Sequence, residues 1–330
     1  MDGWLARICI HDRGVPVSVD GFGFEVSMCG HEVDFGLLVV PAADVPTMDN
    51  GRLRPLSSRP GSGWNDIHSV VEGWVRNYDV GVAPYAFLEF DTKSGAHGLA
   101  TPSMFLRASE IAQFPSLDGD GDVSSIIRER RTGLAFRLLD LLQRGPIGSA
   151  SRSILEQMLA ALPDGSVLLH IGIMFSRSNE IRVHVGVPSH AVEEYLDAIS
   201  WPGSWETVAR VLGRYASAES LTILQLELKE LVSPGIGIEF SPGSGLGHGR
   251  SRGWSTLVER LVEDGLCDAA TNDLLAAWPK VRRRRLSPEA WPCTIRQDIS
   301  HVKITVRPDQ PLRAKAYLSV VPSFSLFGAG

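Results

Sequence analysis

Residues 167–175 read VLLHIGIMF and residues 181–187 read IRVHVGV, and these two runs decide the fold of this chain. Both are rich in the β-branched residues that strands favour, and the short polar segment between them has the composition of a turn. In the second run, apolar residues alternate with Arg182 and His184. This period of two predicts an antiparallel hairpin with one apolar and one polar face.

The same order of elements recurs on both sides of this hairpin. Apolar residues at helical spacing predict helices over 65–77, 126–144, 153–162, 189–199, 205–215, 254–263 and 271–278. Alternation and apolar runs predict strands over 85–91, 104–106, 221–231, 236–240, 300–307 and 312–320. Ser189 is expected to cap the helix that begins with it. Hairpins separated by helices are typical of an α+β protein with an antiparallel sheet rather than a doubly wound parallel one.

The chain has 330 residues, of which 44% are hydrophobic, so its length alone allows one large domain or two smaller ones. Residues 1–64 form a strand-rich N-terminal section, and residues 65–320 carry the repeated helix–hairpin units. The Gly- and Ser-rich segment 241–253 is linker-like, yet the same order of elements continues beyond it. We therefore expect a single domain over residues 1–330, with segment 241–253 as a candidate lid.

Composition and charge exclude several classes of protein. A formal net charge of −6 makes nucleic acid an unfavourable partner. The chain lacks the uninterrupted run of about 18 apolar residues that a membrane helix needs, and its first residues do not read as a signal peptide. Its four cysteines are scattered, which predicts reduced thiols rather than disulfides or a zinc site. These features predict a cytoplasmic protein that has no membrane span.

The polar faces of the predicted strands carry the functional information. They are rich in side chains that bind anions, move protons or stack on rings: Tyr85, Glu89, Asp91, His170, Arg182, His184, Gln225, Glu227, Lys229, His301, Lys303, Arg307, Arg313, Lys315 and Tyr317. Two arrangements remain open, namely an open sheet with a solvated polar face and a closed barrel whose polar face lines its interior. The repeated Arg, His and Tyr favour the barrel.

The repeated α-β-β-α units, the strand-borne Arg, Lys and Tyr, and the step Lys315-x-Tyr317 resemble the ABBA-type aromatic prenyltransferases. The likeness covers most of residues 65–320. It implies a closed barrel surrounded by helices, whose interior holds a prenyl diphosphate against cationic side chains. The chain departs from the family pattern in the next-to-last strand, which reads Lys303-x-Thr305-x-Arg307.

The resemblance also implies a role for individual residues. The diphosphate would be met by Arg182, Lys229, Lys303, Arg307 and Lys315. Tyr85 and Tyr317 would flank the allylic cation. Glu89 would take a proton from the acceptor, with His184 and His301 as alternative bases.

The partners implied by the resemblance are an isoprenoid diphosphate and an aromatic or peptide acceptor. No cofactor is required and no residue is predicted to ligate a metal, although Mg²⁺ could accompany the diphosphate.

Two other functions fit the same pattern. The polar face could bind a peptide or a partner of a biosynthetic pathway without catalysis, or a barrel could use His and Glu for proton transfer in an isomerisation or cyclisation. The basic run Lys280–Arg285 is expected to be a solvated loop, with docking of an acidic partner as the alternative.

Overall fold

A computed structural model describes residues 17–41, 62–79, 82–91, 101–108, 123–142, 147–175, 179–216, 221–241, 252–285 and 292–324. Five antiparallel strand pairs follow one another along the chain. They are β1 (Val17–Ser27) with β2 (Val33–Pro41), β3 (Ala86–Phe90) with β4 (Ser103–Arg107), β5 (Val167–Met174) with β6 (Glu180–Pro188), β7 (Leu221–Leu228) with β8 (Val232–Phe240), and β10 (Pro292–Val306) with β11 (Arg313–Phe324). One further strand, β9 (Lys280–Arg285), precedes the last pair.

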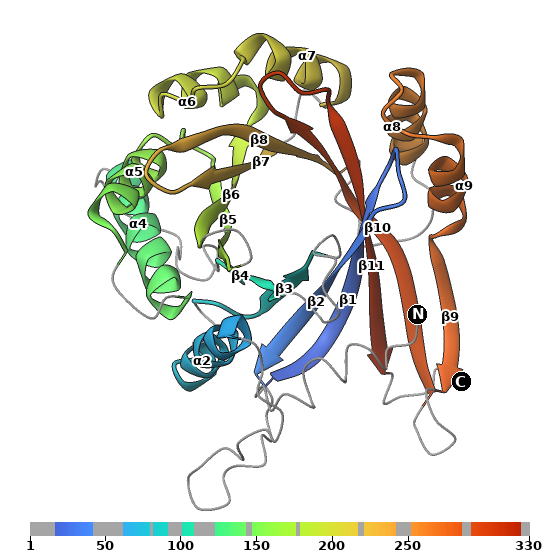
Figure 1. The fold of residues 1–330 in the computed structure, drawn as a ribbon, viewed down its shortest axis with the longest axis horizontal. Coiled ribbons are helices and arrows are strands. Elements are labelled where there is room, and N and C mark those ends of the chain that lie inside the picture. Colours follow the sequence, from blue (N-terminus) through green and yellow to red (C-terminus); the bar gives the residue numbers. More distant parts are fainter. Residues whose placement is uncertain are drawn as a thin grey trace, which may run out of the picture.

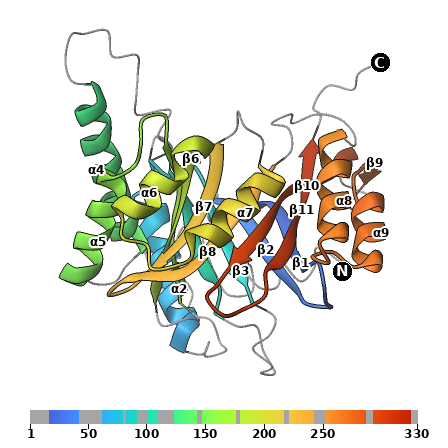
Figure 2. The ribbon, with the colours of Figure 1, turned by 90° about the horizontal axis from the view of Figure 1, so that it is seen from above.

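Helices fill the intervals between the strand pairs. They are α2 (Ser62–Arg76), α4 (Val123–Leu142), α5 (Ser149–Ala160), the short 3₁₀ helix η2 (Ser189–Ala191), α6 (Val192–Ala198), α7 (Trp205–Tyr215), α8 (Arg252–Glu263) and α9 (Ala269–Ala277). Figure 1 shows α2, α4, α5, α6 and α7 outside the wall of the barrel, with α8 and α9 beside β10 and β9. Seen from above in Figure 2, α4 and α5 lie at the opposite end from α8 and α9.

The sheet closes on itself because the last strand of the chain pairs with the first. The strand order β11-β1-β2-β3-β4-β5-β6-β7-β8-β10 is completed by pairing between β10 and β11, which gives a closed antiparallel barrel of ten strands. Tyr317 of β11 lies opposite Glu25 of β1 and opposite His301 of β10. The α+β barrel expected from the sequence is therefore confirmed.

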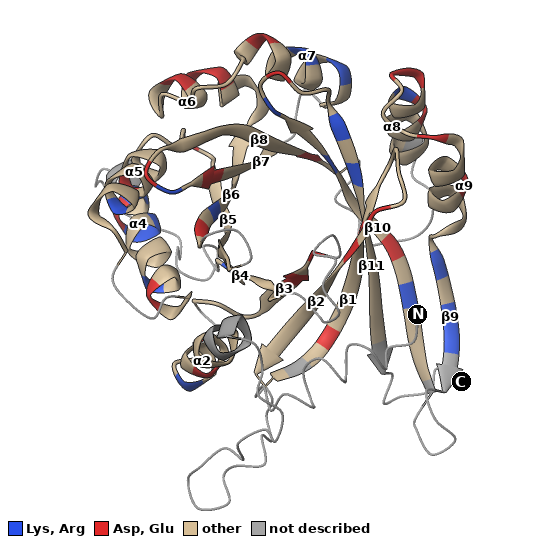
Figure 3. Ribbon diagram, viewed as in Figure 1, with Lys and Arg blue, Asp and Glu red and all other residues tan. Residues whose placement is uncertain are grey.

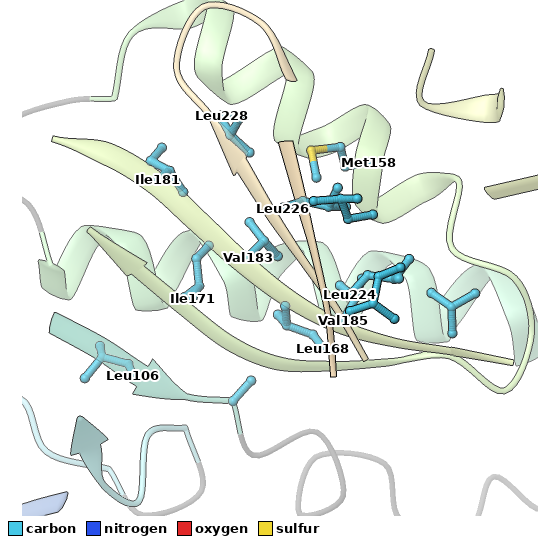
Figure 4. Close-up of a cluster of buried hydrophobic side chains, with 14 of the residues drawn as sticks. Leu106, Met158, Leu168, Ile171, Ile181, Val183, Val185, Leu224, Leu226 and Leu228 are labelled. Carbon is cyan, nitrogen blue, oxygen red and sulfur yellow. The ribbon is translucent and has the colours of Figure 1, made fainter. Parts of the chain in front are cut away.

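The hydrophobic core lies between the outer face of the barrel and the helices. Figure 4 shows this packing at strands β4 to β7, where Ile171, Val183 and Leu226 lie in the same buried cluster as Met158 of α5, which is drawn beside Leu226. These residues alternate along their strands with polar ones, so the period of two assigns the apolar set to the outside. Burial of this set supplies the apolar contact that fixes the helices on the barrel wall.

Two local predictions were wrong. The run Lys280–Arg285 is not a loop but strand β9, whose Arg282 lies opposite Ile295 of β10. Ser189 does not cap a helix with its side chain; its hydroxyl hydrogen-bonds the Thr222 hydroxyl on β7 at 2.9 Å, and α6 begins after η2. In each case a contact with a neighbouring strand overrides the local sequence signal.

Other predictions are confirmed, or they concern residues outside the described ranges. Helix α7 has the predicted bounds, and the strand-rich N-terminal section supplies β1 and β2. The candidate lid lies outside the described residues except at its two ends. Among the helices in the described ranges, none is both long enough and apolar enough to cross a membrane.

Candidate active site inside the barrel

Ion pairs between strands that are not neighbours show which side chains share the barrel interior. Arg182 of β6 approaches Glu89 of β3 at 3.6 Å, although β4 and β5 separate the two strands in the wall. Lys303 of β10 likewise approaches Glu25 of β1 at 3.4 Å, past β11. Side chains converge on the concave inner face of a closed wall and diverge on its convex outer face, so these contacts indicate that the polar strand faces point inwards. Figure 3 shows charged residues on several strands of the wall.

Glu25 is the centre of a cluster of charged side chains on β1, β2, β10 and β11. Lys315 Nζ lies 2.7 Å from Glu25 Oε1 and 3.1 Å from Asp34 Oδ2, while Lys303 Nζ lies 3.4 Å from Glu25 Oε1. Burial alone would raise the pKa of Glu25, but the charges of Lys303 and Lys315 outweigh it and hold that pKa far below its usual value. Glu25 is therefore a carboxylate at neutral pH that pairs with both lysines.

Arg182 forms a second cluster. Its guanidinium donates to Glu227 Oε1 from both Nε, at 3.1 Å, and Nη2, at 2.5 Å, and its side chain is only 6% exposed. The carboxylates of Glu227 and Glu89 raise the pKa of Arg182 despite its burial. Burial and the charge of Glu25 raise the pKa of Glu89, although Arg182 opposes that rise. Glu89 is thus the interior acid whose pKa moves towards neutrality.

Histidines form a third cluster. Glu239 lies between His184 and His301, with Oε1 at 3.8 Å from His184 Nδ1 and Oε2 at 3.7 Å from His301 Nε2. His184 Nε2 is also 3.1 Å from Gln225 Nε2, and its ring meets that of His170 edge to face at 5.4 Å.

Burial lowers the pKa of all three histidines; nearby positive charges add to the effect, and at His301 the carboxylates of Glu239 and Glu25 oppose it. The pKa of His170 falls to about 3. Nε2 of His170 and Nε2 of His301 are buried without a hydrogen-bond partner in the described structure. The histidines are therefore neutral near neutral pH, and two of them keep an unused ring nitrogen.

Tyr317 joins the histidine and lysine clusters. Its ring stacks on that of His301 at 4.1 Å between centroids, and Lys303 Nζ lies 5.0 Å from the same ring. Burial and the carboxylate of Glu25 raise the pKa of the Tyr317 hydroxyl well above its usual value. A neutral ring face close to an ammonium group is an arrangement that stabilises cations.

The structure brings most of the residues predicted from the sequence into this interior. Those brought together are Glu89, Arg182, His184, His301, Lys303, Lys315 and Tyr317. Tyr85 lies directly before β3, half-buried, with its ring edge to face against Phe87 at 5.4 Å. Lys229 and Arg307 lie exposed just beyond the ends of β7 and β10, outside these clusters. Sequence alternation predicted that both side chains point into the barrel. That rule applies only within a strand, and both residues lie just beyond a strand end.

Several interior acids were missed by the sequence analysis. Glu25 and Asp34 lie in the N-terminal section that received no strand assignment, and Glu239 received no role. The signal was present in the alternation Phe24-Glu25-Val26 and Ile238-Glu239-Phe240. Together with Glu89 and Glu227, these acids outnumber the fixed cations Arg182, Lys303 and Lys315 in the described interior.

Metal coordination is not built into the described part of the chain. Within those ranges, no group of three or more His, Cys, Asp and Glu side chains is placed to hold a metal ion. The carboxylates of Glu25, Asp34, Glu89 and Glu227 instead pair with lysine or arginine, and that of Glu239 lies between two histidines. What the described interior offers is a set of strand-borne cations, neutral histidines and one acid with a raised pKa.

No protein-family model and no curated protein matches the chain. Several solved structures resemble it. Similar structures are 5-dimethylallyltryptophan synthase from Streptomyces coelicolor (15% identity over 92% of this chain and 80% of that one, TM-score 0.48), prenyltransferase PriB (14%, 92% and 80%, 0.44) and AnaPT from Neosartorya fischeri (13%, 93% and 78%, 0.46). At these low identities the likeness concerns the fold.

Proposed function

We propose that the barrel interior transfers a prenyl group from an allylic diphosphate to an aromatic or peptide acceptor. The observation that carries this proposal is the presence of Arg182, Lys303 and Lys315 in the interior of one closed barrel, with Lys303 Nζ 5.0 Å from the ring of Tyr317. Cations fixed on rigid strands and shielded from water are the groups that stabilise a departing diphosphate.

The reaction would divide between the three clusters. Breaking the allylic C–O bond sends its electron pair to the diphosphate, whose negative charge Lys303, Lys315 and Arg182 would meet. The allylic carbon, left cationic, would lie against the face of Tyr317. Attack by the acceptor forms the new bond, and the proton it then loses would pass to Glu89, whose raised pKa suits a general base, or to His184 or His301.

Diphosphate binding requires the interior cations to change partners. Each now faces a carboxylate: Glu25 and Asp34 for Lys315, Glu25 for Lys303, and Glu227 and Glu89 for Arg182. An entering diphosphate has to compete with these carboxylates for the lysine and arginine side chains. Mg²⁺ bound to the diphosphate would reduce the negative charge that the carboxylates repel. We therefore expect binding that differs between samples with and without Mg²⁺.

The test is ligand binding followed by product analysis. The full chain is titrated with dimethylallyl or geranyl diphosphate, with and without Mg²⁺, and its thermal unfolding is recorded. Ligand at about 100 times its dissociation constant should stabilise the fold by roughly 2.7 kcal/mol. Incubation with tryptophan or a tryptophan-containing peptide should then add the mass of the prenyl group to the acceptor. These probes match the ligands named for similar structures, DMASPP with Trp and dimethylallyl thiolodiphosphate with L-tryptophan.

Lys315→Met is the informative variant, because Lys303 remains to pair with Glu25. It should lose the stabilisation by diphosphate, whereas Arg210→Ala on the exposed face of α7 should retain it. If no allylic diphosphate shifts the unfolding temperature of the wild-type chain and no acceptor gains mass, the proposal is wrong. A Lys315→Met variant that binds diphosphate as the wild type does would remove this lysine from the site.

One observation favours a second function, proton transfer in an isomerisation or cyclisation. The interior acids outnumber the cations, and the buried His301 ring keeps an unpartnered nitrogen close to Glu239. Such a site would exchange a C–H proton of a bound carbonyl compound with solvent. Deuterium uptake by a panel of cyclic enones in D₂O, abolished by His301→Gln and accompanied by no diphosphate binding, would support this function instead.

A further inference from the structure

Strand β9 lies outside the closed barrel and forms the end of the sheet. The first half of β10, Pro292–Gln297, pairs with β9, whereas its second half, Val302–Val306, pairs with β8. Figure 1 shows β9 at the side of the molecule, away from the ring of barrel strands. Among the described strands, β9 pairs only with β10. Its other edge therefore presents backbone N–H and C=O groups that no described strand satisfies.

Basic side chains line this strand, as the blue along β9 in Figure 3 shows. Lys280, Arg282 and Arg283 are exposed, and none of them forms an ion pair with another described residue. This sets them apart from the interior cations, each of which faces a carboxylate. A basic strand on a chain with a net charge of −6 attracts acidic groups locally.

A pocket lies beside the same strand. It has a volume of about 230 Å³ and is lined by Leu274, Ala277 and Trp278 at the end of α9, by Lys280 and Arg282 of β9, and by Gln297 of β10. The shared lining places Lys280 and Arg282 on the pocket side of β9. The volume is below the roughly 300–1,000 Å³ typical of small-molecule sites, which fits a single apolar side chain better than a whole ligand.

We propose that the edge of β9 with which no described strand pairs binds an extended acidic peptide as an added strand. Main-chain hydrogen bonds would join the peptide to β9, and alternate side chains of the peptide would face the pocket. On that side, acidic side chains would pair with Lys280 and Arg282, and one apolar side chain would enter between Leu274 and Trp278. This site is separate from the barrel interior and does not depend on the reaction performed there.

Two alternative roles for the basic edge fit less well. Charges on an edge strand can serve only to prevent pairing between copies, but that role needs no apolar pocket beside them. Single-stranded nucleic acid prefers basic grooves with exposed aromatic rings for stacking; here the indole of Trp278 is engaged, donating its N–H to the Asp298 carbonyl and meeting Phe24 edge to face. A strand edge offers main-chain pairing, which only a peptide can use fully.

The test measures binding of a short fluorescein-labelled peptide to the full chain by fluorescence anisotropy. Alternate positions of this peptide carry glutamate, with one valine among them, so that the acidic side chains and the apolar one lie on the same side of the added strand. Saturable binding should weaken about tenfold or more in Arg282→Glu and stay unchanged in Arg210→Glu on α7, which alters the net charge equally. The same peptide with lysine in place of glutamate should not bind. Circular dichroism and thermal unfolding of both variants establish that they are folded, and Arg282→Gln replaces Arg282→Glu if that variant is not.

Two peptides N-methylated at alternate residues, in opposite phase, test strand addition on the unaltered protein. Only every second N–H of an added strand points towards its neighbour, so one phase should bind and the other should not. Equal binding of both phases, absence of saturable binding, or displacement of the peptide by an equal concentration of single-stranded RNA would each overturn the proposal.

Discussion

Glu25 shows how strongly the interior depends on single residues. Lys303 and Lys315 lie directly opposite one another on β10 and β11, a register in which like charges repel. Glu25 contacts both ammonium groups from β1. Without this carboxylate, Lys303 would lose the only anion within ion-pair distance in the described structure. The two strands that close the barrel therefore depend on an acid from a third.

Replacing this acid should destabilise the fold. Loss of one partner from a buried ion pair costs about 3–5 kcal/mol, and because Lys315 is about a quarter exposed and keeps Asp34 we expect Glu25→Gln to cost about 2–3 kcal/mol. Urea unfolding at neutral pH measures this difference, with Glu259→Gln on the exposed face of α8 as a control that should change little.

The pH dependence of the same variant gives a second measurement. The folded-state pKa of Glu25 is depressed, so its contribution is complete above its unfolded pKa of about 4.3 and is lost as the pH falls towards the folded value. The difference between wild type and Glu25→Gln should therefore be constant near neutrality and shrink in acid. A difference that persisted unchanged below about pH 3 would show that it does not arise from this charge.

The interior cations could be predicted from the sequence, but most of the carboxylates that pair with them could not. Alternation along one strand was enough to place Arg182 and Lys303 on a polar face. Their carboxylate partners come from strands distant in the chain, as when Arg182 of β6 meets Glu89 of β3, and a single strand carries no information about such pairs. Lys229 was misplaced because the alternation of β7 continues by one step beyond the end of the strand at Leu228.

At the scale of elements, glycines on the inner face make room for large neighbours. Gly172 of β5 lies between Phe105 of β4 and Arg182 of β6. A Cβ atom at Gly172 would lie 2.1 Å from Phe105 Cδ1 and 2.7 Å from the Met104 carbonyl oxygen. The Phe105 ring in turn lies 5.5 Å from the guanidinium carbon of Arg182. Because Gly172 has no side chain, the Phe105 ring can approach β5 closely.

Gly172→Ala should therefore be strongly unfavourable, since a contact with backbone oxygen cannot be relieved by turning a side chain. Overpacking of this kind costs about 1–3 kcal/mol. Gly213→Ala on α7, where a Cβ would meet nothing within 4 Å, should instead stabilise the fold by about 0.5–1 kcal/mol. Chemical denaturation of both variants measures the two opposite signs. Equal effects would mean that the space around Gly172 is not limiting.

Strand β9 marks the limit of element prediction from this sequence. The run of four arginines shows no alternation of apolar residues and is not bounded by turn residues, so its composition predicts a solvated loop. The run nevertheless forms strand β9, because the long β10 extends beyond the barrel and offers an edge with which β9 pairs. By contrast, the hairpin of β5 and β6 was predictable because its own alternation encodes both its strands and its buried face.

For the whole molecule, closure of the sheet is the property that sequence patterns could not supply. Each hairpin is local, but closure depends on the pairing of β11 with β1, the two ends of the described chain. The Arg, His and Tyr residues of the polar faces and the family resemblance favoured closure, whereas alternation alone left an open sheet compatible with the sequence. Closure has an electrostatic consequence: the polar faces, which an open sheet would leave in water, become an interior where charges must find partners and histidines remain neutral.

The neutral histidines should make the whole fold sensitive to mild acid. Burial, opposed in part by Glu239 at His301, lowers the folded-state pKa values of His170, His184 and His301, whereas in the unfolded chain they titrate at about 6.5. Below that pH the unfolded chain binds protons that the folded chain does not, so the free energy of unfolding must fall as the pH falls. Each histidine contributes a loss of up to about 1.4 kcal/mol per pH unit until its own folded pKa is reached.

Glu89 opposes this trend in part, because its raised pKa adds stability as the pH falls. The partial exposure of the His301 side chain reduces the loss of stability that this histidine contributes. We therefore expect the free energy of unfolding in guanidinium to drop by about 2–3 kcal/mol per pH unit between about pH 6 and pH 5. His170→Phe keeps a ring in contact with Phe87 and His184, removes one titrating group, and should reduce that slope by about 1.4 kcal/mol per unit. A wild-type stability that stays constant from about pH 7 to pH 5 would mean that the interior admits enough water or counter-charge to let these rings protonate as freely as in the unfolded chain.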